Sequence, residues 1–389
     1  MVGPGHSGHP RIAASVCRMQ AGGGWATPPD GYLDAVGGQP VLPAAALAQD
    51  LARAEAWADP TRLHHPGRRA GALLDAARAS LAASLSALQA PGCTPIRPDE
   101  VFLTASLARA QALALAACAD PVAIGAVEAA AMLDLAEART GTRIVPVDAA
   151  GRVRPAAFAG AGTAVLQAAN PEVGTRQPVE EVAAGAPGSL IVDAAQVLGH
   201  DLLPGGWTTL IASARDWAGP AGLAVMVVRG GRAPAAGLRG WLDGFPDVPA
   251  AVAAATALEA LLPHWEQAAA ADRLRIAAIR EAAARIPDVE VVGDPDDRLP
   301  HVVTFSVLYV SGEAIVHALD AQDLAVASGS ACVDESARPS HVLAAMGAYT
   351  GGNVRVSLPF GCTDRTVEHL IEALPGTIAR LRDDVIGAR

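Results

Sequence analysis

Short apolar runs alternate with segments of helical period between about residues 31 and 247 of this chain. The runs are rich in β-branched residues and are bounded by Gly, Pro or Asp, as buried strands are. Expected strands are 101–104, 122–127, 143–147, 164–169, 189–194, 208–213 and 224–229, and expected helices include 67–89, 107–118 and 129–139. Buried strands joined by helices predict an α/β layer fold with a mostly parallel sheet.

The pattern changes at about residue 248. Two long helical segments are followed by further apolar runs and a closing amphipathic segment; they cover 248–262, 265–286, 289–292, 302–307, 325–328, 353–358 and 364–382. This order predicts a second, smaller α/β domain. We therefore expect a flexible Gly-, Pro- and His-rich tail over 1–30, a large α/β domain over 31–247 and a small α/β domain over 248–389.

Composition narrows the classes of function. The formal net charge of −11 argues against a surface for nucleic acid or anionic membrane. No apolar run approaches the roughly 20 residues that span a bilayer. The five cysteines have neither CxxC nor metal-ligand spacing, so we expect no metal site and a reducing cytoplasm. All 29 basic residues are arginine, so no lysine amine is available for covalent catalysis.

One candidate ligand site lies at the end of an expected strand. The segment 191–199, IVDAAQVLG, ends its strand at Asp193 and places Gln196 just beyond it. Open α/β sheets bind ligands at the carboxyl ends of their strands. Taken alone, the plainer interpretation of Asp193 is a solvated or capping aspartate.

Motifs in the C-terminal part of the chain are more specific. The segment 327–347 reads ASGSACVDESARPSHVLAAMG, and 353–358 reads NVRVSL. These resemble the cysteine loop and the Arg-x-Ser strand of cysteine desulfurases, of the class V aminotransferase branch of fold-type I pyridoxal-phosphate enzymes. The likeness runs from about Tyr32 to Arg382. It includes YLDAVGGQPVLP, DPTRLHHPGRRA with His64 on the family's histidine, and AANPEVGTRQPVEEV.

The resemblance implies that part of a pyridoxal-phosphate pocket is retained. Asp193 would pair with the pyridine nitrogen and make the ring an electron sink. Gln196 and Asn170 would contact the ring hydroxyl. Ser213 keeps the serine of the family's Ser-Gly-His-Lys segment, which reads Ser-Ala-Arg-Asp here.

Other positions of that pocket depart from the family pattern. Asp216 stands where the Schiff-base lysine belongs, and Ala129 stands where a histidine would stack on the ring. The phosphate loop reads ASLAR at 105–109, and the partner-subunit loop reads RGWL at 239–242, so both lose a threonine. From these losses we expect no bound cofactor and no pyridoxal-phosphate-dependent desulfurase activity. Weak, non-covalent pyridoxal 5′-phosphate remains the alternative.

Two substrate-side residues are retained. The resemblance implies that Arg355 grips a substrate carboxylate and that Cys332 carries a persulfide. The plainer interpretations are an ion pair for Arg355 and a buried, inert thiol for Cys332. Asp334 and Glu335 would raise the thiol pKa, which argues against a highly reactive thiolate. His64 and His341 are expected to pack or cap rather than bind metal.

The sequence therefore predicts a degenerate cysteine desulfurase homologue that forms a homodimer. Its expected role is sulfur handling, in which Cys332 accepts a persulfide from a donor and passes it to an acceptor protein. One alternative is a non-catalytic scaffold or regulatory subunit that pairs with an active desulfurase. Another is an enzyme with new chemistry, in which Asp216 and Asp193 act as acid and base.

Overall fold

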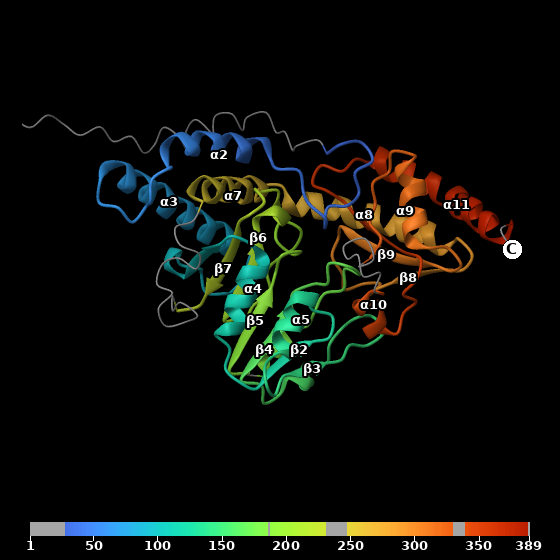
Figure 1. Ribbon diagram of the computed structural model, residues 1–389, viewed down its shortest axis with the longest axis horizontal. Helices are drawn as coiled ribbons and strands as arrows, with labels where there is room; N and C mark the ends of the chain where they lie inside the picture. Colours follow the sequence, from blue (N-terminus) through green and yellow to red (C-terminus); the bar gives the residue numbers. More distant parts are fainter. Residues whose placement is uncertain (1–27, 186, 231–246, 330–338, 388–389) are drawn as a thin grey trace, which may run out of the picture.

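The computed structural model describes residues 28–387, apart from 186, 231–246 and 330–338 (Figure 1). Three expectations from the sequence fall largely or wholly outside these residues: the tail over 1–30, the loop at 239–242, and Cys332. Among the described residues, no helix is long and apolar enough to cross a membrane.

A seven-stranded sheet in the order β1-β7-β6-β5-β4-β2-β3 forms the centre of the larger part. Its strands are β1 Val101–Thr104, β2 Val122–Gly125, β3 Arg143–Val145, β4 Thr163–Gln167, β5 Ser189–Asp193, β6 Thr209–Ser213 and β7 Ala224–Val228. The neighbours from β6 to β3 run parallel, and β7 is antiparallel to both β6 and β1. The mostly parallel α/β architecture predicted from the sequence is confirmed.

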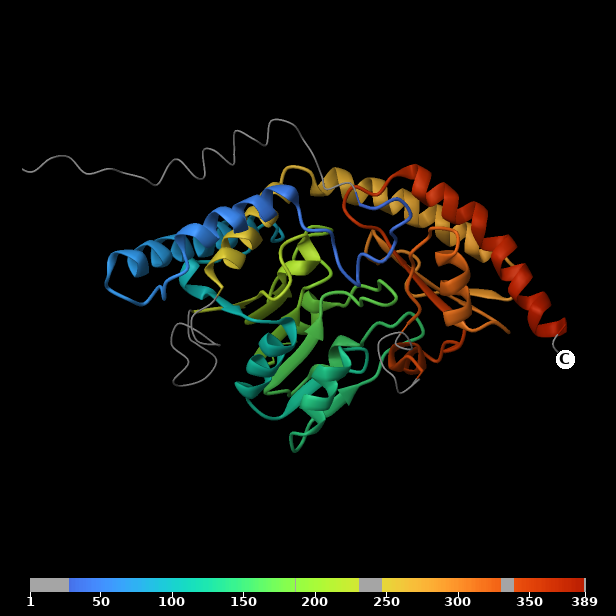
Figure 2. The ribbon, with the colours of Figure 1, turned by 45° about the horizontal axis from the view of Figure 1, so that its top comes forward.

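Alternate residues of the central strands face two separate apolar cores. Leu190 and Val192 of β5 pack into the core that contains helices α2 Pro43–Glu55, α3 His65–Ala87 and α7 Val248–Leu261. Ile191 packs on the opposite face with α4 Leu107–Ala116 and α5 Ala130–Glu137. Figures 1 and 2 show these two helix groups on opposite sides of the sheet. Both faces are covered, which explains why the strands are continuously apolar.

A three-stranded antiparallel sheet, in the order β10-β9-β8, forms the smaller part. Its strands are β8 Val289–Val292, β9 Val302–Val307 and β10 Asn353–Ser357. Helices α8 Trp265–Ala284, α9 Gly312–Asp320 and α11 Asp364–Gly387 contribute to its core. The shorter elements of the chain are α6 Val179–Ala184, α10 His341–Met346 and the 3-10 turns η1 Pro98–Glu100, η2 Pro155–Phe158 and η3 Ala214–Trp217.

Two features differ from the expected organisation. The boundary at residue 248 places α7 in the small domain, whereas the buried face of α7 belongs to the core of the seven-stranded sheet, against α2 and α3. The expected strand 325–328 is wrong, because Ala325 and Ala327 make only isolated bridges, to Tyr32 and Arg355. These bridges join the start of the described chain to the small sheet.

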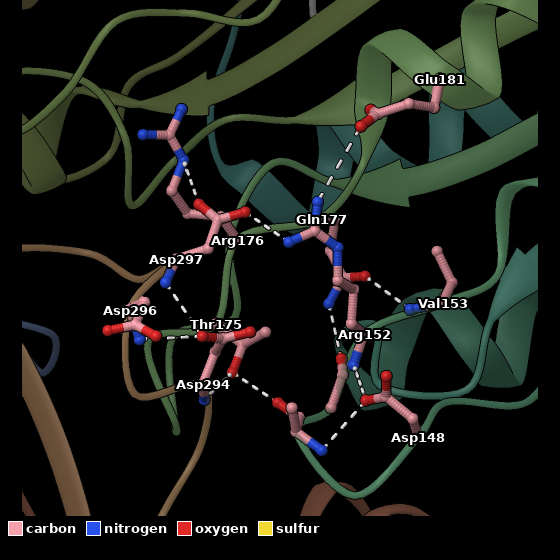
Figure 3. A network of polar contacts seen from close by, with 12 residues as sticks. Asp148, Arg152, Val153, Thr175, Arg176, Gln177, Glu181, Asp294, Asp296 and Asp297 are labelled. Atoms are coloured by element: carbon pink, nitrogen blue, oxygen red, sulfur yellow. Dashed lines mark hydrogen bonds and ion pairs between the residues drawn. The ribbon is translucent and has the colours of Figure 1, made fainter.

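The two parts meet through a polar network (Figure 3). Arg152 and Arg176 of the large part both pair with Asp297, the latter at 3.6 Å. The amide of Asp294 donates to Thr175 Oγ1 at 3.0 Å, and Thr175 in turn donates to Ala150 O. The network fixes the loop after β8 against the segment that follows β4.

Candidate functional site

The carboxyl ends of several strands meet at one edge of the large sheet. β4, β5 and β6 are parallel neighbours, with Gln167 opposite Asp193 and Asp193 opposite Ile211. β1 runs in the same direction as β6, because each is antiparallel to β7. Helix α4, which follows β1, therefore begins at this edge as well. The expected site residues on these elements are brought together by the topology.

Asp193 ends β5 and is held by neutral donors. Its Oδ2 accepts from Gln111 Nε2 of α4 at 2.9 Å, and its Oδ1 accepts from the amide of Ala195 at 3.0 Å. Burial raises the pKa of the Asp193 carboxyl despite these two hydrogen bonds. The group is thus positioned to share a proton with a ligand at the sheet edge.

Asp216 lies on η3, directly after β6, and its side chain is only 5% exposed. Its Oδ1 accepts from Gln196 Nε2 at 3.5 Å and lies 4.0 Å from Arg215 Nε, so both contacts are at the outer limit for their type. Burial raises the pKa of Asp216 to about 7, Arg215 opposes this rise, and Asp193 adds to it. The structure thus brings Asp216, Gln196 and Asp193 to one edge of the sheet.

A third buried carboxyl stands beside this pair. Glu128 follows β2, and its Oε1 accepts from the amide of Gln167 at 2.9 Å. Burial raises the Glu128 pKa well above its ordinary value, and the charge of Asp193 contributes. Sequence reasoning missed both Glu128 and Gln111. Gln111 follows the first turn of a helix that begins at the sheet edge, which is a signal that could have identified it.

Asn170 is fully buried and supports the turn after β4. Its Oδ1 accepts from the amides of Glu172 and Val173 at 2.8 and 2.9 Å, and its Nδ2 donates to Val127 O at 3.1 Å. One Nδ2 hydrogen remains for a ligand such as the ring hydroxyl. Asn170 thus has a structural role in addition to the ligand-binding role that the resemblance implies.

The expected phosphate end of the site is built from the start of α4. Ser106 caps this helix by accepting from the amide of Arg109 at 3.2 Å, and Leu107 and Ala108 form its first turn. A helix N-terminus offers amide hydrogens to an anion even without the threonine. Ser213 is half-buried at the end of β6. Ala129 is the N-cap of α5 and makes no side-chain capping bond.

Arg355 projects from β10 and forms an ion pair with Asp34. Arg355 Nη2 donates to Asp34 Oδ1 at 2.9 Å, and the two side chains are 16% and 27% exposed. Among the residues that the structure describes, none forms a hydrogen bond with the buried Arg355 Nε. The ion pair is the plainer interpretation offered above. Sequence reasoning missed Asp34, although it lies in the YLD segment.

The described residues reach Gly329 on one side of the cysteine loop and Pro339 on the other. The amide of Gly329 donates to Asn353 Oδ1 at 2.7 Å, and Ser340 Oγ donates to Glu172 Oε2 at 2.8 Å. His341 Nε2 lies 2.9 Å from Glu128 O.

His64 caps α3 by accepting from the amide of Gly67 at 3.1 Å, so its expected capping role is confirmed.

Comparison with known proteins places these features in context. The sequence profile of the Aminotransferase class-V family matches residues 239–370. A cysteine desulfurase from Cereibacter sphaeroides is 32% identical over 90% of this chain and 96% of its own length. One from Gluconacetobacter diazotrophicus is 31% identical over 90% and 94%. A NifS-like protein from Rickettsia africae has a TM-score of 0.78 at 20% identity, covering 90% of this chain and 99% of that one, and so shares the fold.

These relatives correct one expectation. We expected no cofactor, but the relatives are cysteine desulfurases, which are pyridoxal-phosphate-dependent, and this points to pyridoxal phosphate. The expectation was wrong because it treated missing contacts as a missing ligand. The strand ends fit the ring: Asp193 is a half-buried carboxyl with a raised pKa, and Asn170 retains a donor. Because the chain has no lysine, these residues could hold the cofactor only without a covalent lysine link.

Proposed function

Because this chain belongs to the cysteine desulfurase family, we propose that it is a sulfur-transfer protein that uses Cys332 and holds its cofactor without a covalent link. The observation that carries the proposal is Asp216, a buried carboxyl at the end of β6 on the position of the family lysine. A carboxylate cannot replace an amine that attacks a carbonyl. Release of sulfur from free cysteine by the lysine-dependent route is therefore the step that this chain lacks.

The cofactor would be held by residues at the strand ends. Asp193 would accept the ring nitrogen proton, Gln196 and Asn170 would contact the ring hydroxyl, and Ser213 and the start of α4 would face the phosphate. When bound, pyridoxal phosphate supplies an electron-withdrawing ring. Gln111 orients Asp193, since its amide fixes one of the two carboxylate oxygens.

The sulfur step needs no external oxidant or reductant. The Cys332 thiolate attacks the outer sulfur of a donor persulfide, a bond forms between the two sulfurs, and the donor leaves as a thiolate. Cys332 then carries a persulfide, and attack by an acceptor thiolate on its outer sulfur returns the Cys332 thiolate. Arg355, already paired with Asp34, would recognise a carboxylate of the donor or acceptor.

Mass spectrometry of the intact protein tests the proposal. Incubation with glutathione persulfide should add one sulfur atom to the wild-type protein and none to Cys332→Ser. Cys93→Ser is the matched control, because Cys93 is a partly exposed free thiol elsewhere in the chain. Sulfur on the Cys332→Ser protein at the wild-type level would refute the assignment to Cys332.

A second candidate function, partner binding, is favoured by apolar side chains around α2. Leu47 and Leu51 lie one helical turn apart on α2 and are 37% and 43% exposed. Trp57 and Leu63, in the connection to α3, are 69% and 86% exposed. Exposed apolar groups gathered in this way mark association surfaces. We propose that a second copy of this chain, or an active desulfurase subunit, covers them.

Sedimentation velocity tests this second proposal. Wild-type protein should sediment as a dimer at micromolar concentration, and Trp57→Arg with Leu51→Arg should shift it toward monomer. Leu274→Arg is the matched control, since Leu274 is 75% exposed on α8. A wild-type monomer, or an equal shift in the control, would refute the proposed surface.

A further inference from the structure

Asp193 and Asp216 lie at the same sheet edge with little positive charge to balance both. Among the described residues, the cation within ion-pair range of Asp216 is Arg215, 4.0 Å away and about half exposed. Asp193 is bonded to neutral donors only, the Gln111 amide and a backbone N–H. A buried carboxylate needs a cation or a proton. The site is therefore complementary to a ligand that carries positive charge.

We propose that this site selects the amine form of its cofactor, pyridoxamine 5′-phosphate, over the aldehyde form. The proposal rests on the proposed function only in taking this edge as the cofactor site. Asp193 would face the protonated ring nitrogen, as the resemblance implies, and Asp216 occupies the position from which the family lysine reaches the reactive carbon. An ammonium on that carbon gives Asp216 a charged donor, whereas an aldehyde oxygen offers it only another acceptor.

The exchange keeps one nitrogen at this position of the site. In the family, the protein supplies the nitrogen and the ligand supplies the aldehyde; here the ligand would supply the nitrogen and the protein the carboxylate. Gln196, 3.5 Å from Asp216 Oδ1, orients that carboxyl without neutralising it. Arg109 and Ser213 stand near the phosphate end and are not needed for the selection between amine and aldehyde.

The selection should depend on pH. The groups that act on Asp216 are Arg215 on its own turn and Asp193 at the end of β5, and Asp193 in turn acts on Glu128. Burial raises the pKa of Asp216 to about 7, so in acid the carboxyl is neutral and loses its charge-assisted hydrogen bond from an ammonium. Above pH 7 the carboxylate is available. Preference for the amine form should therefore increase from pH 6 to pH 8.

Calorimetric titration of the full-length, ligand-free protein with three ligands tests the proposal. Pyridoxamine 5′-phosphate and pyridoxine 5′-phosphate differ only by an ammonium against a hydroxyl, and pyridoxal 5′-phosphate carries the aldehyde. At pH 8 we expect the amine to bind on the order of 10- to 100-fold more tightly than the alcohol, as for one charge-assisted hydrogen bond. Asp216→Asn should bring this ratio close to one. Asp134→Asn, on the exposed face of α5, should leave the ratio unchanged.

The wild-type protein alone also tests the proposal, in case Asp216→Asn does not fold. The ratio of amine to alcohol affinity should fall as the pH is lowered from 8 to 6, because Asp216 then becomes protonated. The proposal is overturned if the aldehyde binds as tightly as the amine, if the ratio does not change with pH, or if the amine does not bind. None of these results bears on sulfur transfer, which is measured separately as sulfur on Cys332.

Discussion

The substitution Asp216→Asn should stabilise the ligand-free protein, and by more at high pH. In the folded protein burial raises the Asp216 pKa to about 7 from its ordinary 3.8, so ionising this carboxyl in the fold costs on the order of 4 kcal/mol. Between pH 3.8 and 7 this carboxyl binds its proton more in the folded state than in the unfolded state, so the contribution of Asp216 to stability falls as the pH rises and levels off above pH 7. An amide has the shape of the protonated acid and carries no such cost.

Urea denaturation at several pH values measures this effect. The gain in unfolding free energy from Asp216→Asn should be less than about 2 kcal/mol at pH 5 and should grow by about 2–3 kcal/mol by pH 8. Asp134→Asn is the matched control and should show neither the gain nor the pH dependence. A gain that is the same at pH 5 and pH 8 would refute the argument that Asp216 is a buried, poorly compensated acid.

Three further predictions follow from contacts around the site. A double-mutant cycle of Asp34→Asn and Arg355→Gln, followed by urea denaturation, should give a coupling energy of about 1–3 kcal/mol, and an additive cycle would contradict the ion pair. Asn170→Ala should lower the free energy of unfolding by about 3 kcal/mol, because two buried amides lose their partner and Val127 O keeps only its bond from Gln167 Nε2; thermal denaturation showing an unchanged Tm would contradict this. His301, buried and stacked on His200 with 3.5 Å between ring centroids, has its pKa lowered to about 3 by burial, so its contribution to stability should fall as the pH drops below 6.5, opposite in sign to that of Asp216. In an Asp216→Asn background, His301→Phe should flatten the fall of urea midpoints between pH 7 and pH 5, and an equally steep fall would exclude His301 as its source.

Much of the fold could be predicted from the pattern of the chain, because its strands are buried on both faces. β1, β8 and β9 begin and end as expected, and the other strands differ from expectation by a few residues. Helix α2 was missed because its sequence, PAAALAQDLARAE, is rich in alanine, which blurs the contrast between its buried and exposed faces. Alanine is also why α7 was assigned to the wrong core: nearly all its residues suit either one.

The site was only partly predictable. Strand ends identified Asp193, and motif register identified Asp216 and Asn170, but the partners of these residues come from distant segments. Gln111 contacts Asp193 across 82 positions of sequence, and Asp34 contacts Arg355 across 321. Periodicity contains no information on such pairs. The error about the cofactor had a related cause. The loss of some side chains that contact the cofactor in the family does not remove the backbone amides and strand-end residues that can still bind it.

In the proposed function, this protein transfers sulfur but does not itself release sulfur from cysteine. Intact-mass spectrometry of two samples of the protein is the most direct test of this proposal. One sample contains cysteine and pyridoxal 5′-phosphate, and the other also contains a catalytic amount of an active cysteine desulfurase. We predict that a sulfur atom is added to Cys332 only in the second sample. Sulfur on Cys332 in the first sample, with cysteine and cofactor alone, would show a self-sufficient desulfurase and would contradict the account.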